Sequence, residues 1–434
     1  MTDTPFLTDL DSRAAVKGSR DPLGIQAIWT RLGRHVVGNL TTVSTSVRDF
    51  TTLLLGYYFA EKVADVEGPG LDLATFLKWE QLAAYARAEV NKDKGFRGME
   101  RVWTRLAEGS RITLSADGTH QILGNQKIYG LWGLYTVPGR TSGLLQGDPP
   151  RLTPPSRELV EKLYLGMLAE DGFRDGQRIV EILRKPKERL DVRGGDARII
   201  AAVARILKPR LRAAEREFFR DHLLWGGPMD ETDGRQKQLA HLFESTLGNR
   251  GFQWSQPALA DLANSARSRG EVWTSLAFHL DRIRTCESVA APVSALFAHI
   301  LALDDRPVKD AVARLREMWG SGLGTISVEA YRGLRTELSS DSSDPTEADR
   351  WIAIAEAAAS GAYAELLDLL FKQNRHVMKG RGGTPWVEEA NGRLKVRFRD
   401  EQGVLPGREE IPLLWRFSYF LDSLRIVAST LAET

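Results

Sequence analysis

Apolar residues recur every three or four positions along most of this chain, and this spacing constrains the fold more than any other feature. Because an α-helix completes a turn in 3.6 residues, such spacing places the apolar side chains on one helical face. The segments that we expect to form amphipathic helices are 71–90, 157–168, 197–224 with a kink or break at Pro209, 236–247, 308–319 and 348–371. The sequence therefore predicts a mainly α protein.

Strand signals are confined to two short stretches. Each has two β-prone runs on either side of a residue pair that favours a two-residue hairpin turn. The expected hairpins are 111–115 with 120–123 around Asp117 and Gly118, and 386–389 with 394–399 around Asn391 and Gly392. We therefore expect a multi-domain helical protein with two small β-hairpins.

The length of 434 residues exceeds one ordinary hydrophobic core, so two or three domains are expected. The proline-rich stretch 147–156 predicts an extended linker, followed by a helix with Thr153 as N-cap and Pro154 in its first turn. The polar stretch 339–344 predicts a second boundary, with Asp344 capping the next helix.

These boundaries predict three domains. They are an N-terminal helical domain over residues 1–146 with a hairpin, a central helical domain over 147–338, and a C-terminal helical domain over 345–434 with a basic hairpin. Helices followed by a hairpin in the first domain are also the order of a winged-helix module, although simple structural packing explains the same order.

Charge and composition restrict the partners and the compartment. A formal net charge of +2 gives no global field, so a nucleic-acid surface has to be a local patch. The first residues carry acids where a secretory signal carries bases, and the apolar cluster 51–60 is far shorter than the roughly 20 residues that span a bilayer. We expect a cytoplasmic protein that does not enter a membrane.

Sequence motifs for cofactors and catalysis are missing. The chain has no GxxxxGK[ST], HExxH or GxSxG, and its seven histidines lack metal-ligand spacing. The lone Cys286 excludes an intramolecular disulfide and a multi-cysteine zinc site. We therefore expect no cofactor and no metal, identify no catalytic residue, and favour a non-enzymatic protein.

The most basic stretch is 371–399, where glycines at 380, 382 and 383 allow close backbone approach. Cations beside such a turn suit phosphate contacts, and Trp386 is placed to stack on a base. The expected nucleic-acid-binding residues here are Arg375, His376, Lys379, Arg381, Lys395 and Arg397. The alternative is a solvated hairpin in which Lys379 and Arg381 pair with acids elsewhere in the chain.

A second basic stripe follows the helical stretch around Pro209. Residues 205, 208, 212, 216 and 220 are all cationic and share one face if the kink is mild. Arg205, Arg212 and Arg216 are therefore a weaker second candidate surface for a phosphate backbone. The alternative is a solvated stripe, because Glu215 and Glu217 stand close by.

A run of hydroxyl residues at 41–46 precedes a helix that we expect to begin near Ser46. The favoured interpretation is helix capping. The alternative is an anion site at this helix N-terminus, formed by Arg34, Thr45 and Arg48. Further along, the aromatic residues 129, 132 and 135 are expected to form a core stripe rather than a partner-docking groove.

The segments RDPLGIQAIW and NLTTVSTSVRDF, within the first 60 residues, resemble the opening of uncharacterised bacterial proteins encoded in phage-defence islands. The segment HVMKGRGGTPW shows a fainter likeness. The resemblance implies accessory subunits that act beside helicases, nucleases or methylases on invading DNA.

We therefore expect a non-enzymatic subunit of a bacterial antiphage defence system that contacts DNA and the other subunits of a complex. One alternative is an enzyme with a dispersed site, such as a nuclease or phosphate-ester hydrolase, with His376 as general acid or base. The other is a structural scaffold that does not bind DNA.

Overall fold

The computed structural model describes residues 21–247, 249, 251–339, 346–399 and 403–433. Helices make up 61% of the structure, and the sheets within these residues are three two-stranded ones. The expected mainly α fold is confirmed. The chain divides into two compact units: unit 1 comprises Met1–Val36 and Asn249–Tyr419, and unit 2 comprises Val37–Gly248 and Phe420–Thr434.

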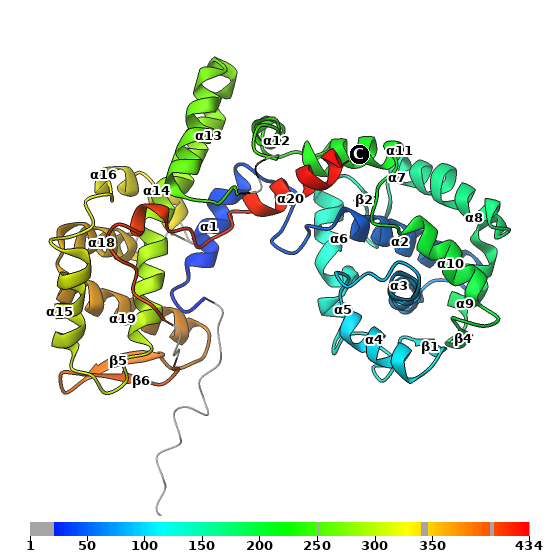
Figure 1. Cartoon of the computed structure of the whole chain (residues 1–434), viewed down its shortest axis with the longest axis horizontal. Coiled ribbons are helices and arrows are strands. Elements are labelled where there is room, and N and C mark those ends of the chain that lie inside the picture. The colour runs from blue at the N-terminus through cyan, green and yellow to red at the C-terminus, as the bar shows by residue number, and fades with distance from the viewer. Residues whose placement is uncertain (1–20, 248, 250, 340–345, 400–402, 434) are drawn as a thin grey trace, which may run out of the picture. The chain divides into compact units, whose positions relative to one another are not determined.

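Unit 2 is built from helices and two of the small sheets (Figure 1). Its α-helices are α2 (Val47–Glu67), α3 (Asp72–Glu89), α4 (Met99–Glu108), α5 (Gln126–Tyr129), α6 (Leu131–Thr141), α7 (Pro154–Leu159), α8 (Gly166–Glu170), α9 (Gln177–Arg184), α10 (Ala197–Ile206), α11 (Ala213–Phe219), α12 (Arg235–Phe243) and α20 (Leu421–Ala432). Its strands and short turns are β1 (Arg111–Ser115), β2 (Leu145–Gln146), β3 (Arg151–Leu152), β4 (Lys187–Asp191), the π-helical turns η1 (Val160–Leu165) and η3 (Arg220–Leu224), and the 3₁₀ turn η2 (Arg174–Gly176).

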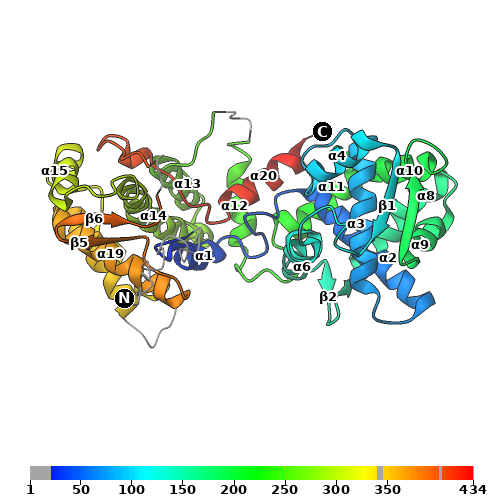
Figure 2. The same ribbon diagram turned by 90° about the horizontal axis from the view of Figure 1, so that it is seen from below.

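Unit 1 holds the remaining elements. They are α1 (Ile25–Arg34), α13 (Gln256–Ser268), α14 (Thr274–Ile300), α15 (Val308–Trp319), α16 (Val328–Arg332), α17 (Arg335–Leu338), α18 (Thr346–Ser360), α19 (Tyr363–Gly380), strands β5 (Val387–Ala390) and β6 (Arg393–Val396), and the 3₁₀ turns η4 (Glu271–Trp273) and η5 (Ile411–Leu413). Figure 2 shows β5 and β6 alongside α19.

The core of unit 2 is organised around α2, which is buried on almost every side from residue 47 to residue 60. Such a helix needs a close neighbour on each face, and α3 is one of them. Gly56 allows this packing, because a Cβ atom there would lie 2.5 Å from Cε2 of Phe76. The indole of Trp79 then donates to the Thr52 carbonyl at 2.8 Å, so the two central helices are joined by shape and by a hydrogen bond.

The expected helices are present, with breaks where backbone chemistry requires them. Helix α15 occupies the expected residues 308–319, and α3 and α12 lie within one to four residues of their expected bounds. Pro209 splits its segment, since α10 ends at Ile206 and α11 begins at Ala213. The segment 348–371 forms two helices, because Gly361 adopts a left-handed φ of 74° between α18 and α19.

One of the two expected hairpins is confirmed and the other is wrong. Strands β5 and β6 pair across Asn391 and Gly392, which both have the positive φ that a tight two-residue turn requires. By contrast, β1 pairs with β4, and residues 120–123 form no strand.

Residues 120–123 do not pair with β1 because Arg105 binds the backbone carbonyl groups of the segment after β1. Its guanidinium donates to the carbonyls of Thr119, His120 and Gln121, at 3.1, 2.7 and 3.0 Å. These carbonyls are therefore not offered to a neighbouring strand, and β1 finds its partner some 70 residues further along the chain. The helix–hairpin order that suggested a winged helix is not formed by the described residues of this region.

The proline-rich stretch 147–156 is not an extended linker. Strands β2 and β3 pair across it, and both lie inside unit 2. Thr153 does precede α7, with Pro154 in the first turn, but its hydroxyl donates to the Gly143 carbonyl at 2.9 Å and makes no N-terminal cap bond. The expected boundary at 338–345 falls inside unit 1, and residues 340–345, including Asp344, lie outside the described residues.

A buried carboxylate holds the segment 416–419 against α14 in unit 1. One oxygen of Glu287 accepts hydrogen bonds from the backbone N–H groups of Arg416 and Phe417, and the other accepts one from the Tyr419 hydroxyl at 2.8 Å. Glu287 is fully buried, and this burial raises the pKa of its carboxyl to about 7 despite the three donors.

We predict that Glu287→Gln removes a pH dependence of stability. The native carboxyl has a raised pKa, so the folded state binds more protons than the unfolded state, and stability falls as pH rises from about 4.5 to about 7. Glutamine keeps the acceptor for both backbone groups and donates to Tyr419 instead. The free energy of unfolding of the variant, minus that of the wild type, should increase by roughly 3 kcal/mol between about pH 4 and pH 8. A difference that is constant across this range in denaturant titrations would contradict the account.

Candidate nucleic-acid interface

The C-terminal half of α19 exposes a cluster of cations because its apolar residues face inward. Residues 366, 367, 370, 371, 374 and 378 are buried at helical spacing, and 375, 376 and 379 lie on the solvent side. Arg375 and Lys379 are four residues apart, and His376 and Lys379 are three apart, so the three side chains share one side of the helix.

The end of α19 is tied to its neighbours in unit 1 by buried amides. Asn374 donates to the Pro22 carbonyl at 2.9 Å and accepts from the Trp386 backbone N–H at 2.7 Å. Gln373 donates to the Leu23 carbonyl, also at 2.9 Å. The cations of α19 therefore stand on a support in which a helix, the segment before α1 and the β5–β6 hairpin are bonded together.

Three of the predicted residues remain available for a partner. Within the part of the chain that the structure describes, Arg375, His376 and Lys379 are exposed and their side chains make no hydrogen bond or ion pair. Lys395 on β6 is 57% exposed, and its Nζ lies 4.0 Å from Glu388. We call Arg375, His376, Lys379 and Lys395 the α19 basic surface.

Glu388 connects the helix and the hairpin parts of this surface electrostatically. The ion pair with Arg397 holds the pKa of its carboxyl below the usual value, and Lys395 and Arg375 act in the same direction. Arg375 and Lys395 therefore both lie near this carboxylate. Its negative charge is already balanced by Arg397, which leaves the other two cations largely uncompensated.

Arg381 and Arg397 serve the fold instead. Arg381 donates to the Asp21 carbonyl and lies 3.3 Å from the Asp21 carboxylate, which also caps α1 by accepting from the Ile25 N–H at 2.8 Å. Arg397 is only 12% exposed, pairs with Glu388 and donates to the Pro385 carbonyl at 3.2 Å. The alternative in which cations pair with acids elsewhere holds for Arg381, whereas Lys379 has no such partner among the described residues.

The prediction that Trp386 stacks on a base is wrong. Its side chain is 4% exposed, and its ring stacks on Phe398 with the centroids 4.1 Å apart. Trp386 immediately precedes β5, on the strand face opposite to that of Leu394 and Val396, so its burial comes from the packing of its own ring, including the stack on Phe398, and not from the strand alternation.

The basic stripe around Arg205 does not form a continuous surface. Arg205 pairs with Glu170 and Asp171, at 3.0 and 2.9 Å. Arg212 donates to the Arg205 and Ile206 carbonyls, at 2.8 and 3.4 Å, and Arg216 donates to the Leu211 carbonyl at 3.0 Å.

The contacts of Arg212 follow from the break at Pro209. A helix end leaves carbonyl groups without partners inside the helix, and guanidinium groups can satisfy them. All three arginines belong to unit 2, whereas the α19 basic surface belongs to unit 1. Of the three arginines, Arg212 therefore caps the broken end of α10, whereas Arg205 and Arg216 are held by other contacts.

The residues of the predicted anion site near Ser46 have other roles: Ser46 caps α2, and Arg48 forms a buried ion pair. Ser46 is the N-cap of α2 and accepts from the Asp49 N–H at 3.2 Å, as favoured from the sequence. Arg48 is buried and pairs with Glu215 at 2.5 Å, while Thr45 is half-buried. Arg34 lies in α1 and belongs to unit 1, whereas Thr45 and Arg48 belong to unit 2. The pairing of Arg48 withdraws its charge from any external anion.

The aromatic stripe at 129–135 is mainly core, as expected. Tyr135 is buried, and Trp132 stacks on Tyr57 with ring centroids 5.2 Å apart. Tyr129 is the exception, with 59% of its surface exposed.

Comparisons with models of protein families, with characterised proteins and with solved structures found no match to this chain. In the described residues, no group of three or more histidine, cysteine or acidic side chains is placed to hold a metal ion. Among the same residues, no helix has the length and apolar character needed to cross a membrane.

We predict that Arg48→Ala strongly destabilises unit 2. Glu215 is fully buried and also accepts from the Tyr164 hydroxyl at 3.0 Å, so loss of Arg48 leaves a buried charge without its main partner. Such a loss costs about 3–5 kcal/mol. Denaturant unfolding should show this decrease, and Lys162→Ala, which breaks an exposed pair with Glu158, should have a far smaller effect. Equal effects of the two substitutions would contradict the assignment.

The pair also has a predicted pH response. Burial acts to raise the pKa of the Glu215 carboxyl, but Arg48, together with Arg212, holds it below the usual value. The pair therefore stabilises the fold above the usual glutamate range and loses this contribution as pH falls through the lowered pKa. The stability difference between wild type and Arg48→Ala should shrink in acid.

Proposed function

We propose that this chain is a DNA-contacting subunit of a bacterial antiphage defence system and that the α19 basic surface makes the contact. The observation that carries this proposal is the group Arg375, His376 and Lys379, exposed within five residues of one helix, whose side chains make no hydrogen bond or ion pair in the described chain. The defence setting and the partner subunits rest on the resemblance of the N-terminal segments to proteins of phage-defence islands.

The chemistry of the surface favours the phosphate backbone over the bases. Lysine and arginine on an exposed helix bind phosphate oxygens and release condensed counterions, which makes the affinity dependent on salt. Phosphate contacts position a protein on DNA but do not select a sequence. Because Trp386 is covered, its ring is not offered to a base. We therefore expect binding with little sequence preference.

Gly380 at the end of α19 leaves open space beside the α19 basic surface. A Cβ atom at this position would meet no atom within 4 Å, and the residue does not adopt a left-handed φ. Alanine would therefore fit, and glycine costs helix stability relative to alanine. The helix end is therefore open to close approach by an external backbone.

We predict that Arg375→Ala with Lys379→Ala weakens DNA binding and flattens its salt dependence. Each lost phosphate contact should reduce the slope of log affinity against log salt by about one. Fluorescence anisotropy with a labelled duplex across a salt series measures both quantities.

The matched control is Lys94→Ala with Lys127→Ala, which removes the same charge from exposed positions of unit 2. The control should leave the salt slope unchanged. If both double variants bind as the wild type does, the α19 basic surface is not the contact.

A further inference from the structure

A hollow of about 270 Å³ lies inside unit 1, between the start of α1 and the C-terminal half of α14. Residues on either side of the β5–β6 hairpin and the segment 416–417 complete its wall. We call it the α14 hollow. Aromatic rings form much of its lining, from Phe297, Trp386, Phe398 and Phe417. Small-molecule sites are typically hollows of this kind, in which an apolar wall carries a few polar groups.

The wall of the α14 hollow is held in place by hydrogen bonds to residues behind it. Glu287 accepts from the backbone N–H groups of Arg416 and Phe417, which fixes that segment against α14. The backbone N–H of Trp386 donates to Asn374 at 2.7 Å, which fixes the start of the hairpin against α19. The hollow is therefore preformed, which lowers the free-energy cost of ordering a ligand there.

Two polar groups of the lining are buried without a partner. Ser294 is 9% exposed and Trp386 is 4% exposed, and Ser294 shares its face of α14 with Phe297, which also lines the hollow. Among the described residues, neither the Ser294 hydroxyl nor the Trp386 indole N–H makes a hydrogen bond. A serine within a helix commonly donates to a carbonyl of the preceding turn, as Ser288 of the same helix does to Thr285 at 2.8 Å. Because buried polar groups normally have a partner, these two groups indicate a ligand in the hollow.

The charged groups of the lining favour an anion. Arg416 is exposed, and in the described chain its side chain makes no hydrogen bond or ion pair, although the buried carboxyl of Glu287 lies near it. The Asp21 carboxylate accepts from the Ile25 N–H and pairs with Arg381 at 3.3 Å, so its charge is balanced within the fold. A guanidinium and an indole N–H can only donate, so the ligand has to supply acceptors.

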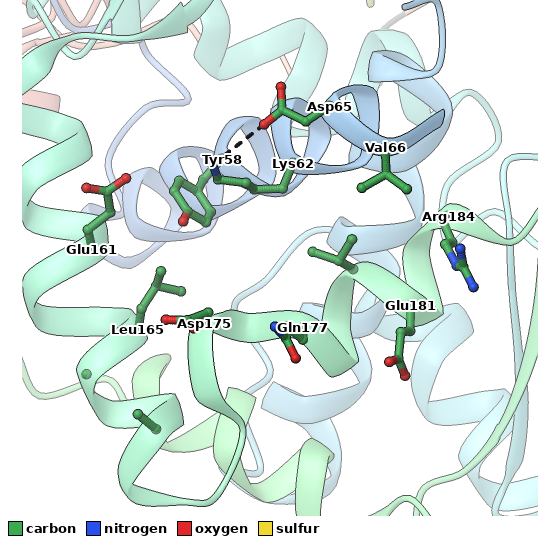
Figure 3. A pocket seen from close by; sticks show the side chains of 13 residues that line it. Tyr58, Lys62, Asp65, Val66, Glu161, Leu165, Asp175, Gln177, Glu181 and Arg184 are labelled. Carbon is green, nitrogen blue, oxygen red and sulfur yellow. Dashed lines mark ion pairs between the residues drawn. The ribbon is translucent and has the colours of Figure 1, made fainter. Parts of the chain in front are cut away.

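A larger hollow in unit 2 differs from the α14 hollow in its polar groups (Figure 3). It measures about 870 Å³, lies beside α2, and is lined by exposed carboxylates. Three of these carboxylates pair with cations: Asp65 with Lys62, Glu161 with Arg157, and Glu181 with Arg178. Among the described residues, none of the side chains that line it has a buried polar atom without a partner. The observations therefore indicate a ligand in the α14 hollow and not in this one.

We propose that the α14 hollow binds a small aromatic carboxylate. The carboxylate accepts hydrogen bonds from Arg416 and from the two unpartnered groups of Ser294 and Trp386. The ring packs against Phe297 and Phe398, and the small volume of the hollow favours a single ring. The site goes beyond the proposed DNA contact, because no residue of the α19 basic surface lines the hollow.

The test is a ligand-observed NMR titration of the full chain with phenylacetate in the absence of DNA. We expect saturable binding of one phenylacetate per chain. Arg416→Gln should weaken it at least about tenfold, because a hydrogen bond between charged groups is lost. Trp386→Phe, which keeps an aromatic ring and removes the N–H, should weaken it several-fold. Phenylacetamide, which lacks the charge, should bind the wild type about tenfold more weakly than phenylacetate.

Ser294→Ala separates a ligand-binding role of the hydroxyl from a structural one. Removing a buried hydroxyl that has no partner relieves the cost of its burial, so the unliganded variant should melt no lower than the wild type. Phenylacetate should nevertheless raise the melting temperature of the variant less than that of the wild type. A lower melting temperature of the unliganded variant shows that the hydroxyl serves the fold and contradicts the proposal.

The matched controls are Ser288→Ala, on the same helix, and Arg314→Gln, at an exposed position of α15. Both should leave phenylacetate binding unchanged. The proposal is overturned if phenylacetate does not bind, if the controls weaken binding as much as the hollow variants do, or if phenylacetamide binds equally well. Because the titration contains no DNA, its result does not depend on the proposed function.

Discussion

Arginine side chains that bond to the chain's own carbonyl groups support much of this fold. Many short helices end in unit 1 and unit 2, and each end leaves carbonyls that the helix itself cannot satisfy. Guanidinium groups offer five donors. Arg212 and Arg282 use theirs on the helix-end carbonyls of 205–206 and 333, and Arg105 bonds in the same way to the turn carbonyls of 119–121. Where the partner is a buried carboxylate, as for Arg48 and Glu215, the same chemistry acts inside the core.

This use of arginine changes what a basic stretch of sequence means. A cation that bonds inside the fold is oriented and partly neutralised, so it contributes little to the attraction of DNA. Arg381 and Arg397 are of this kind, although they are neighbours in sequence of the α19 basic surface. The distinction separates cations that bond inside the fold, Arg381 from the end of α19 to Asp21 and Arg397 to Glu388 and Pro385, from cations that remain exposed on the same support. It also explains why a net charge of +2 is compatible with a local binding surface.

The sequence predicts the helices well because their apolar spacing is local, as α15 illustrates. It predicts the hairpin at Asn391 and Gly392 for the same reason, since a two-residue turn depends on those residues alone. It fails at Asp117 and Gly118, where Arg105 from a preceding helix decides the outcome. The exposed residues of the candidate surface were predicted from the sequence. The sequence did not reveal that Arg381 pairs with Asp21 and so leaves the surface, because the two residues are 360 positions apart.

The most direct test of the central claim is lysine-reactivity footprinting by mass spectrometry, with and without duplex DNA. Acylation reports each exposed amine separately, so it distinguishes the α19 basic surface from the stretch around Pro209. The account predicts that DNA protects Lys379 and Lys395 while Lys208, next to the break at Pro209, reacts as before. Protection of Lys208 with undiminished reactivity of Lys379 and Lys395 would contradict it.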